Sequence, residues 1–200
     1  SYGTVEKKSA KELLDDEHFW ETLPKNESSF KDDSIILLDQ LCKKYPNSEI
    51  SIMKSLHDLL PDGAHVFLGN SLPIRYFELV QNKKFIIMAN RGVNGIDGQL
   101  ATAQGWGLST KKTVYCILGD MSLSYDLSSL LELPANVKCI VINNSGGRIF
   151  ETLQLDQRLV MEHTRNFKDI GTGFGLRYSS CLGDLEHAQL IELLPDLNES

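Results

Sequence analysis

The sequence lacks a long apolar run. No stretch approaches the roughly 20 consecutive apolar residues that a membrane-spanning helix requires. Residues 1–10 (SYGTVEKKSA) also have no apolar centre of the kind found in signal peptides. The sequence therefore predicts a cytoplasmic protein with no membrane partner.

Clusters of positive charge are also missing. The 20 lysines and arginines are outnumbered by 27 aspartates and glutamates, which gives a formal net charge of -7. The basic residues form no cluster longer than pairs such as Lys43-Lys44 and Lys83-Lys84. A nucleic-acid partner would require a basic surface, so we expect small-molecule ligands instead.

Motifs for zinc and for dinucleotides are absent too. The four cysteines lie far apart without a C-x-x-C pair, and the five histidines show no spacing that suggests a shared metal. No G-x-G-x-x-G motif follows the first predicted strand, which counts against a dinucleotide-binding enzyme. The scattered cysteines fit a reduced, intracellular protein.

The chain divides into a polar N-terminal segment and a main domain. Residues 1–47 are charge-rich and predict a helical appendage or linker from a preceding domain, with helices at 9–23 and 34–45 that end at Pro24 and Pro46. From residue 48 onward the apolar pattern tightens, and 48–200 is long enough for one α/β core.

Short apolar runs alternate with helix-length segments along the main domain. The predicted strands cover residues 65–68, 85–89, 113–118, 138–142 and, less clearly, 176–180. Residues 114–118 and 139–142 are apolar on both faces, as in central strands that helices cover on either side. The pattern predicts a doubly wound, mainly parallel α/β sheet. Residues 194–200 look like the exit of a helix with no apolar strand after it.

Ligands of such sheets bind beyond the carboxyl ends of the strands, and residues 69–75 (GNSLPIR) occupy the first of these ends. Glycine and small polar residues there lead into a helix that carries Arg75, an arrangement suited to an anion. The alternative is that Ser71 caps the helix and Arg75 is a surface residue.

Residues 90–98 (NRGVNGIDG) follow the second strand and contain three glycines. Glycine at this density permits close approach of a ligand to the backbone. A merely flexible loop is the alternative, but the large apolar Ile96 in its middle favours a functional one.

Asp120 and Asn144 follow the third and fourth strands and lie 24 residues apart in sequence. In a parallel βαβ unit this spacing brings both side chains to the same edge of the sheet. Their oxygens, with the carbonyl of Gly146, are the hard ligands that Mg²⁺ prefers. Taken singly, Asp120 could be a helix cap and residues 143–147 (NNSGG) an ordinary turn.

These motifs resemble those of a known family. Gly119-Asp120, followed by Asn143-Asn144, resembles the signature of thiamine-diphosphate enzymes. Residues 69–75, 89–98 (ANRGVNGIDG) and 143–150 (NNSGGRIF) resemble MenD, the 2-succinyl-5-enolpyruvyl-6-hydroxy-3-cyclohexene-1-carboxylate synthase family. The resemblance covers roughly residues 48–180, and it implies the diphosphate-binding domain of that family.

The resemblance implies roles for individual residues. Mg²⁺ (or Mn²⁺) would be held by Asp120, Asn144 and the Gly146 carbonyl, and Ile96 would keep the cofactor bent. The other residues expected to contact cofactor are Asn70, Met121 and Ser122. Those expected to face the substrates are Ser71, Arg75, Arg91, Ile149 and Phe150.

MenD enzymes decarboxylate 2-oxoglutarate and add the succinyl unit to isochorismate in menaquinone or phylloquinone biosynthesis. Both substrates carry carboxylates, which arginine binds bidentately, and loss of either charge is expected to cost about 1.5 to 3 kcal/mol per bond.

The resemblance also implies a homo-oligomeric transferase whose pyrimidine-binding domain, with its glutamate, precedes this one. Members of the family usually continue into one more strand, so the resemblance implies that domain 48–200 is truncated at its C-terminus. Because the pyrimidine-binding domain is absent here, we expect this chain to be inactive alone. A non-catalytic binding module with the same fold is the alternative.

Overall fold

The structure is a computed structural model that describes residues 30–80, 82–92, 94–152 and 161–197. The chain divides into an N-terminal unit, residues 1–36, and a second unit, residues 37–200. Helix α3 (Phe30–Lys44) is the first described element. None of the helices within the described ranges is long and apolar enough to cross a membrane.

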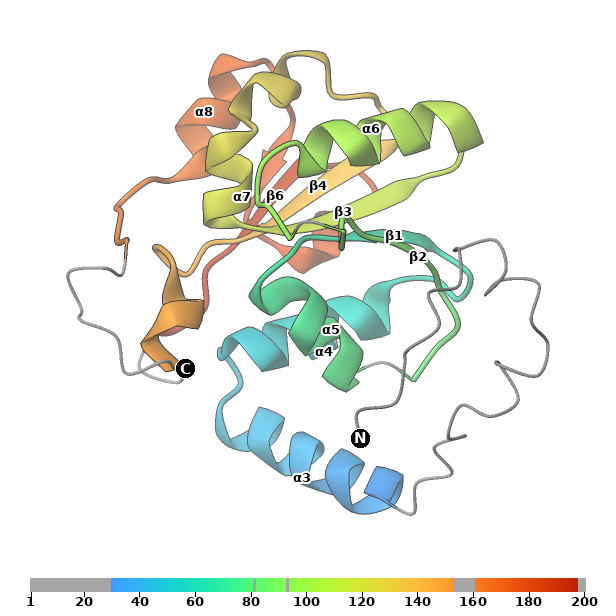
Figure 1. The fold of residues 1–200 in the computed structure, drawn as a ribbon, viewed down its shortest axis with the longest axis vertical. Helices are drawn as coiled ribbons and strands as arrows, with labels where there is room; N and C mark the ends of the chain where they lie inside the picture. Colours follow the sequence, from blue (N-terminus) through green and yellow to red (C-terminus); the bar gives the residue numbers. More distant parts are fainter. Residues whose placement is uncertain (1–29, 81, 93, 153–160, 198–200) are drawn as a thin grey trace, which may run out of the picture. The chain divides into compact units, whose positions relative to one another are not determined.

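A six-stranded sheet forms the centre of the second unit, in the order β2-β1-β3-β4-β6-β5 (Figure 1). Every pair of neighbouring strands is parallel. The strands are β1 (His65–Leu68), β2 (Ile86–Met88), β3 (Val114–Gly119), β4 (Val137–Ile142), β5 (Tyr178–Ser179) and β6 (Leu190–Leu193).

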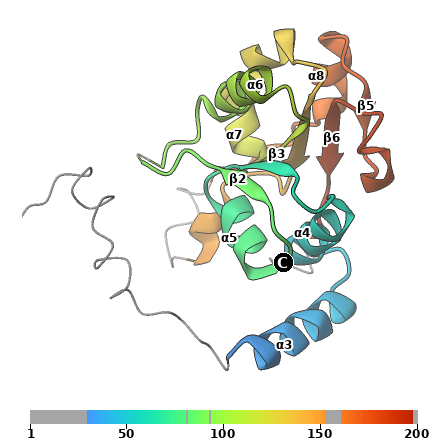
Figure 2. The ribbon, with the colours of Figure 1, turned by 90° about the vertical axis from the view of Figure 1, so that its right-hand side faces the viewer.

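Helices cover both faces of this sheet, with α4 and α5 on one side and α6, α7 and α8 on the other (Figures 1 and 2). The helices are α4 (Glu49–Leu59), α5 (Leu72–Val80), α6 (Gln99–Thr110), α7 (Asp120–Tyr125) and α8 (Phe167–Gly173). Short 3-10 helices are η1 (Leu127–Glu132), η2 (Arg148–Thr152) and η4 (Leu182–Asp184).

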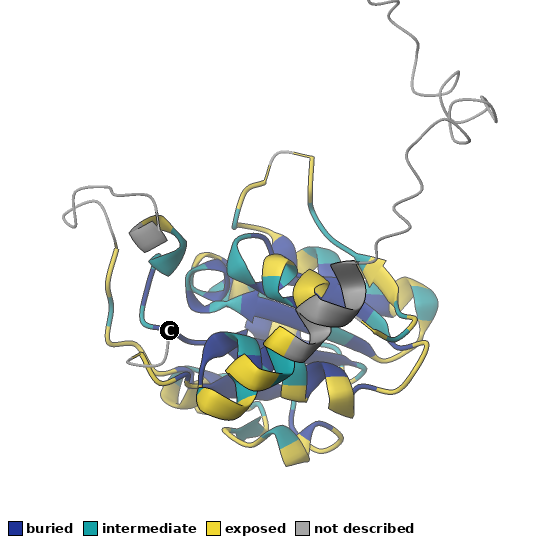
Figure 3. Cartoon of the chain, turned by 90° about the horizontal axis from the view of Figure 1, so that it is seen from below, coloured by how far each residue is buried: buried dark blue, intermediate teal, exposed yellow. Residues whose placement is uncertain are grey.

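The strands pack against both helical layers because successive side chains point to opposite faces. In β3, Cys116 packs with α6, whereas the adjacent Ile117 packs with α4 and α5. Every residue of β4 is buried, and the buried interior of the fold is visible in Figure 3. The two-sided burial predicted for the central strands is therefore confirmed.

Helix α4 shows how local sequence sets the element bounds. Ser48 caps its N-terminus, since its hydroxyl accepts a hydrogen bond from the Ser51 N–H at 3.4 Å. Met53 and Leu56 recur at helical spacing and are fully buried against the sheet. The helix ends just before Pro61, and β1 follows as predicted.

The predicted doubly wound parallel fold is confirmed. All five predicted strands are present within a residue or two of their expected ends, and α3 contains most of the helix predicted at 34–45. The helix predicted at 9–23 lies outside the described residues.

The expectation that a helix leads into residues 194–200 was wrong. The residues just before 194 form β6, which lies between β4 and β5 and is buried at all four positions. Glu192 interrupts its apolar run and hides the strand in the sequence. Its carboxylate can be buried because hydrogen bonds from Asn143, Phe167 and Tyr178 offset the cost of removing the charge from water.

Candidate functional site

A cavity of about 680 Å³ opens beyond the carboxyl ends of β1, β3 and β4. Its walls include all of the residues that the sequence analysis placed in a site, although those residues come from four separate segments. They are Asn70, Ser71, Arg75, Arg91, Ile96, Asp120, Met121, Ser122, Asn144, Gly146, Ile149 and Phe150. Its volume lies in the range of small-molecule and cofactor sites.

Asp120 lies at the floor of this cavity, directly after β3, and is 2% exposed. Its Oδ1 accepts a hydrogen bond from the Met121 N–H at 2.6 Å, and its Oδ2 accepts one from the Gly146 N–H at 2.9 Å. Burial raises the pKa of the Asp120 carboxyl, while these N–H groups and the nearby His163 oppose the shift. Asp120 thus joins the end of β3 to the turn after β4.

That turn has a backbone that only glycine accepts easily. Gly146 has a φ of +148°, and a Cβ built there would lie 2.0 Å from the carbonyl oxygen of Met161. The Gly147 N–H donates to the same carbonyl, and the His163 N–H donates to Ser145 O. This pairing carries the His163 side chain to Asp120, where Nε2 lies 3.1 Å from Oδ2.

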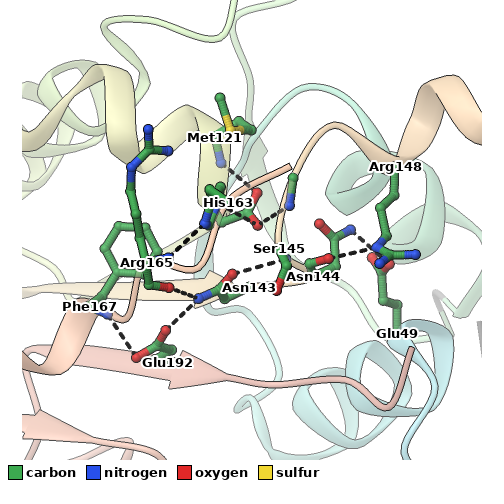
Figure 4. Close-up of polar contacts among 12 residues, drawn as sticks. Glu49, Met121, Asn143, Asn144, Ser145, Arg148, His163, Arg165, Phe167 and Glu192 are labelled. Carbon is green, nitrogen blue, oxygen red and sulfur yellow. Dashed lines mark hydrogen bonds and ion pairs between the residues drawn. The ribbon is translucent and has the colours of Figure 1, made fainter. Parts of the chain in front are cut away.

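Asn143 and Asn144 directly follow β4, and their side chains extend to opposite sides (Figure 4). Asn143 Nδ2 donates to Glu192 Oε1 at 2.7 Å, and its Oδ1 accepts from the Ser145 N–H at 3.1 Å. Asn144 Nδ2 donates to Glu49 Oε1 at 2.8 Å. The Oδ1 of Asn144 is buried and has no hydrogen-bond partner. It is one of three such buried side-chain atoms in the described part of the chain.

The glycine-rich loop at 90–98 is held by polar side chains beneath it. Asn70 Nδ2 donates to Asn90 O at 2.8 Å and to Gly95 O at 2.6 Å. Gln99 Nε2 also donates to Gly95 O at 2.6 Å, and its Oε1 accepts from the Asn70 N–H at 3.2 Å. These bonds fix the backbone next to the partly buried Ile96.

The two predicted arginines lie at the cavity rim and are exposed. Arg75 Nη1 donates to Ser71 O at 2.6 Å, and Ser71 itself has a positive φ of 76°. Arg91 Nη1 donates to Asn70 Oδ1 at 3.1 Å. Each guanidinium keeps further N–H donors for an anion in the cavity.

The remaining predicted residues complete the walls of the cavity. Ser122 is buried and Met121 partly so, both in the first turn of α7. Ile149 is partly buried, and Phe150, in the short helix η2, is 45% exposed. An exposed aromatic ring at this position gives the cavity an apolar wall.

Asp126 lies close to these motifs in sequence but has a structural role. Its Oδ2 accepts hydrogen bonds from the N–H groups of Leu100 and Ala101, at 2.6 and 3.1 Å. Its Oδ1 accepts from the Ser129 hydroxyl at 2.9 Å. The carboxylate therefore satisfies the free N–H groups at the start of α6.

Three residues of this region were missed by the sequence analysis. Glu49 lines the cavity from the first turn of α4, Gln99 supports the glycine-rich loop, and His163 approaches Asp120. Of these, only Gln99 gave a local signal, since it directly follows the glycine-rich loop. Glu49 and His163 arrive through contacts between distant segments.

The described residues contain no group of three or more histidine, cysteine, aspartate or glutamate side chains that could hold a metal ion. A cation at this site would therefore need amide or backbone oxygens besides Asp120. The free Oδ1 of Asn144 is such an oxygen, so the side chains present fit a hard divalent cation.

The fold is one that occurs among thiamine-diphosphate enzymes. The chain is similar to an X-ray structure from Mycobacterium smegmatis that was assigned as a thiamin diphosphate-dependent enzyme, with a TM-score of 0.59 and 17% sequence identity. The likeness covers 75% of this chain and 32% of that one. At this identity the similarity establishes the fold.

The sequence gives the family. The chain belongs to the 2-succinyl-5-enolpyruvyl-6-hydroxy-3-cyclohexene-1-carboxylate synthase (MenD) family, although no protein-family model matches it. It is 37% identical to the synthase of Proteus mirabilis over 149 residues, which are 68% of this chain and 27% of that protein. It is 38% identical to the Bdellovibrio bacteriovorus synthase over 136 residues, which are 64% of this chain and 26% of that protein. The chain thus spans about a quarter of the length of these relatives.

Proposed function

We propose that this chain is the diphosphate- and magnesium-binding part of a thiamine-diphosphate-dependent transferase of the MenD type. The whole enzyme would decarboxylate 2-oxoglutarate and add the succinyl unit to isochorismate in menaquinone or phylloquinone biosynthesis. Residues 48–200 would form the cofactor domain, and residues 1–47 would connect it to a preceding domain.

The observation that carries this proposal is the free Oδ1 of Asn144. Asp120 and Asn144 are both buried, and the N–H of Gly146 ties the turn of Asn144 to Asp120. Leaving a buried acceptor without a partner costs about 1 to 3 kcal/mol. A bound Mg²⁺ or Mn²⁺ would satisfy this oxygen together with Asp120 and the Gly146 carbonyl, and would leave its other positions to phosphate oxygens.

Thiamine diphosphate would occupy the rest of the cavity. Its diphosphate would lie by Asp120, Met121 and Ser122, and its rings would lie by Asn70 and Ile96, which the bonded loop holds in place. When bound, this cofactor supplies the carbanion stabilisation that decarboxylation and carbon–carbon bond formation require.

The rim of the cavity suits dicarboxylate substrates. Arg75 and Arg91 keep a permanent positive charge and offer paired N–H donors to carboxylates. Ser71 would add a hydroxyl group, and Ile149 and Phe150 would exclude water from the reacting carbons. These roles agree with a 2-oxo acid and isochorismate as substrates.

The chain has no counterpart for about three quarters of the relatives' length. We propose that the missing part includes a pyrimidine-binding domain, whose glutamate activates the cofactor, and that the full-length enzyme is a cytoplasmic homo-oligomer. This chain would then bind cofactor without turning over 2-oxoglutarate.

Calorimetric titration of the chain with thiamine diphosphate, with and without Mg²⁺, tests the proposal. We expect binding that requires Mg²⁺ and that Asp120→Ala abolishes. The control Glu132→Ala removes an exposed carboxylate outside the cavity, so this variant should bind thiamine diphosphate as the native chain does. Equal binding by the native and Asp120→Ala chains, or no binding by the native chain, would overturn the proposed site.

A further inference from the structure

Asn144 is held at two points, by a residue from a distant part of the chain and by one from its own turn. Its Nδ2 donates to Glu49 Oε1 at 2.8 Å, a buried contact between residues 95 apart in sequence. Its backbone carbonyl accepts a hydrogen bond from Arg148 Nε at 2.7 Å. Figure 4 shows Glu49 and Arg148 beside Asn144, on the side away from Asn143 and Glu192. Backbone and side chain of Asn144 are therefore both fixed.

The chemistry of this contact selects one orientation of the amide. An ionised carboxylate can only accept hydrogen bonds, whereas a carboxamide has a donor end and an acceptor end. With Nδ2 toward Glu49, a hydrogen bond forms; with the amide turned over, two oxygens would face one another. The carboxylate thus fixes Oδ1 on the other side, where it is buried without a partner.

Glu49 occupies a buried position beside Asn144. It is the first residue of α4, next to the capping residue Ser48, whose hydroxyl lies 2.9 Å from that of Ser51. A glutamate in a first turn commonly extends into solvent, where it favours the helix dipole. Glu49 is instead 5% exposed and lines the cavity.

We propose that Glu49 is a positioning residue that presents the Asn144 oxygen to the divalent cation. This inference rests on the proposed cation site and names a residue outside the sequence motifs. Glu49 acts through Asn144: it sets which atom of the amide faces the cation, and the cation then completes the bonding of that atom.

The test compares cation affinity among variants of the full chain. Mn²⁺ binding in the presence of thiamine diphosphate is followed by the loss of the free-ion electron paramagnetic resonance signal. Glu49→Leu should weaken Mn²⁺ binding by about tenfold or more, as expected when a hydrogen bond to a charged group is lost. Glu49→Gln can still accept from Nδ2 but permits either orientation, so we expect a smaller loss. Glu132→Gln, the same change at an exposed position, should match the native chain.

A reciprocal swap separates orientation from packing. In Glu49→Gln/Asn144→Asp the glutamine would donate to one oxygen of the aspartate, and the other oxygen would face the cation. We expect this double variant to bind Mn²⁺ within about threefold of the native chain, and more tightly than Glu49→Leu. The unfolding midpoint without ligand is measured in parallel, since a purely structural role would change that value alone.

Three results would overturn the inference, and they can be distinguished from one another. If Glu49→Leu binds Mn²⁺ as tightly as the native chain while Asp120→Ala does not bind it, the cation site stands and the role of Glu49 is wrong. If the native chain shows no Mn²⁺-dependent binding, the proposed site and this inference fail together. If Glu49→Leu does not fold, Glu49→Gln and the double variant decide. A double variant that folds but does not bind Mn²⁺ would overturn the inference.

Discussion

Asn143 and Asn144 are neighbours in sequence, chemically identical and both buried, yet their surroundings differ. Asn143 Nδ2 donates to Arg165 O and to Glu192 Oε1, and its Oδ1 accepts from the Ser145 N–H. The side chain of Asn144 has a hydrogen-bond partner at Nδ2 only. The side chain of Asn143 is bonded at both ends, as expected for a structural residue, while that of Asn144 keeps one acceptor for a ligand.

Each asparagine has a buried glutamate as its partner, and the two glutamates lie in different surroundings. Glu192 accepts from three donors on separate segments and ties β6 to the residues before α8. Glu49 accepts from Asn144 at the cavity wall. The difference indicates that one asparagine–glutamate pair stabilises the fold and the other prepares the site.

The largest effect is expected from Glu192→Leu. This change keeps the side chain's approximate volume but leaves the Asn143 amide, the Phe167 N–H and the Tyr178 hydroxyl without their acceptor. We expect the free energy of unfolding to fall by about 3 kcal/mol or more, because several buried donors lose their partner at once. Urea unfolding followed by circular dichroism measures the change. A loss below about 1 kcal/mol would mean that Glu192 does not support the fold as described.

A smaller and more selective difference is expected between Asn143→Ala and Asn144→Ala. Asn143→Ala removes three hydrogen bonds and should lower the free energy of unfolding by about 2 to 3 kcal/mol. Asn144→Ala removes one hydrogen bond together with an unsatisfied oxygen, so the loss should be about 1 kcal/mol or less.

Ligand binding should rank the same two variants in the opposite order. Mg²⁺-dependent binding of thiamine diphosphate should disappear in Asn144→Ala and persist in the folded fraction of Asn143→Ala. The comparison between the two asparagines breaks down if both variants lose stability equally or if both keep the binding.

The sequence was sufficient for the central strands because their burial on both faces leaves continuous apolar runs. Residues 139–142 formed such a run even though β4 also contains Lys138, whose Nζ donates to two carbonyls, those of Glu186 and Ala188. Strand β6 is only four residues long, and Glu192 separates its apolar residues. A buried charge that is satisfied by distant partners cannot be distinguished from an exposed one in a single sequence.

The same limit applies to the site. The glycine-rich turns and the Asp120 and Asn144 positions follow directly after strands, so the parallel topology was enough to predict that they meet. Glu49 and His163 carry no motif, and each reaches the site through a contact that only the folded chain forms. Residues that support a ligand from a neighbouring element are therefore the ones that sequence reasoning misses.

The smallest expected effect uses Cys139, which lies in β4 ahead of the two asparagines, as a probe of the strand. Burial raises the pKa of this thiol to about 12, so at neutral pH it stays protonated and unreactive while the strand is folded. Labelling with a maleimide, mapped by mass spectrometry, should be slow at Cys139 and fast at the exposed Cys181. Asn144→Ala should leave the Cys139 rate within about fivefold of native, whereas Asn143→Ala should raise it by about thirtyfold or more, since each 1.4 kcal/mol loss of stability increases the open population tenfold. If Asn144→Ala exposes Cys139 as much as Asn143→Ala does, the second asparagine also supports the strand, and its free oxygen cannot be assigned to ligand binding alone.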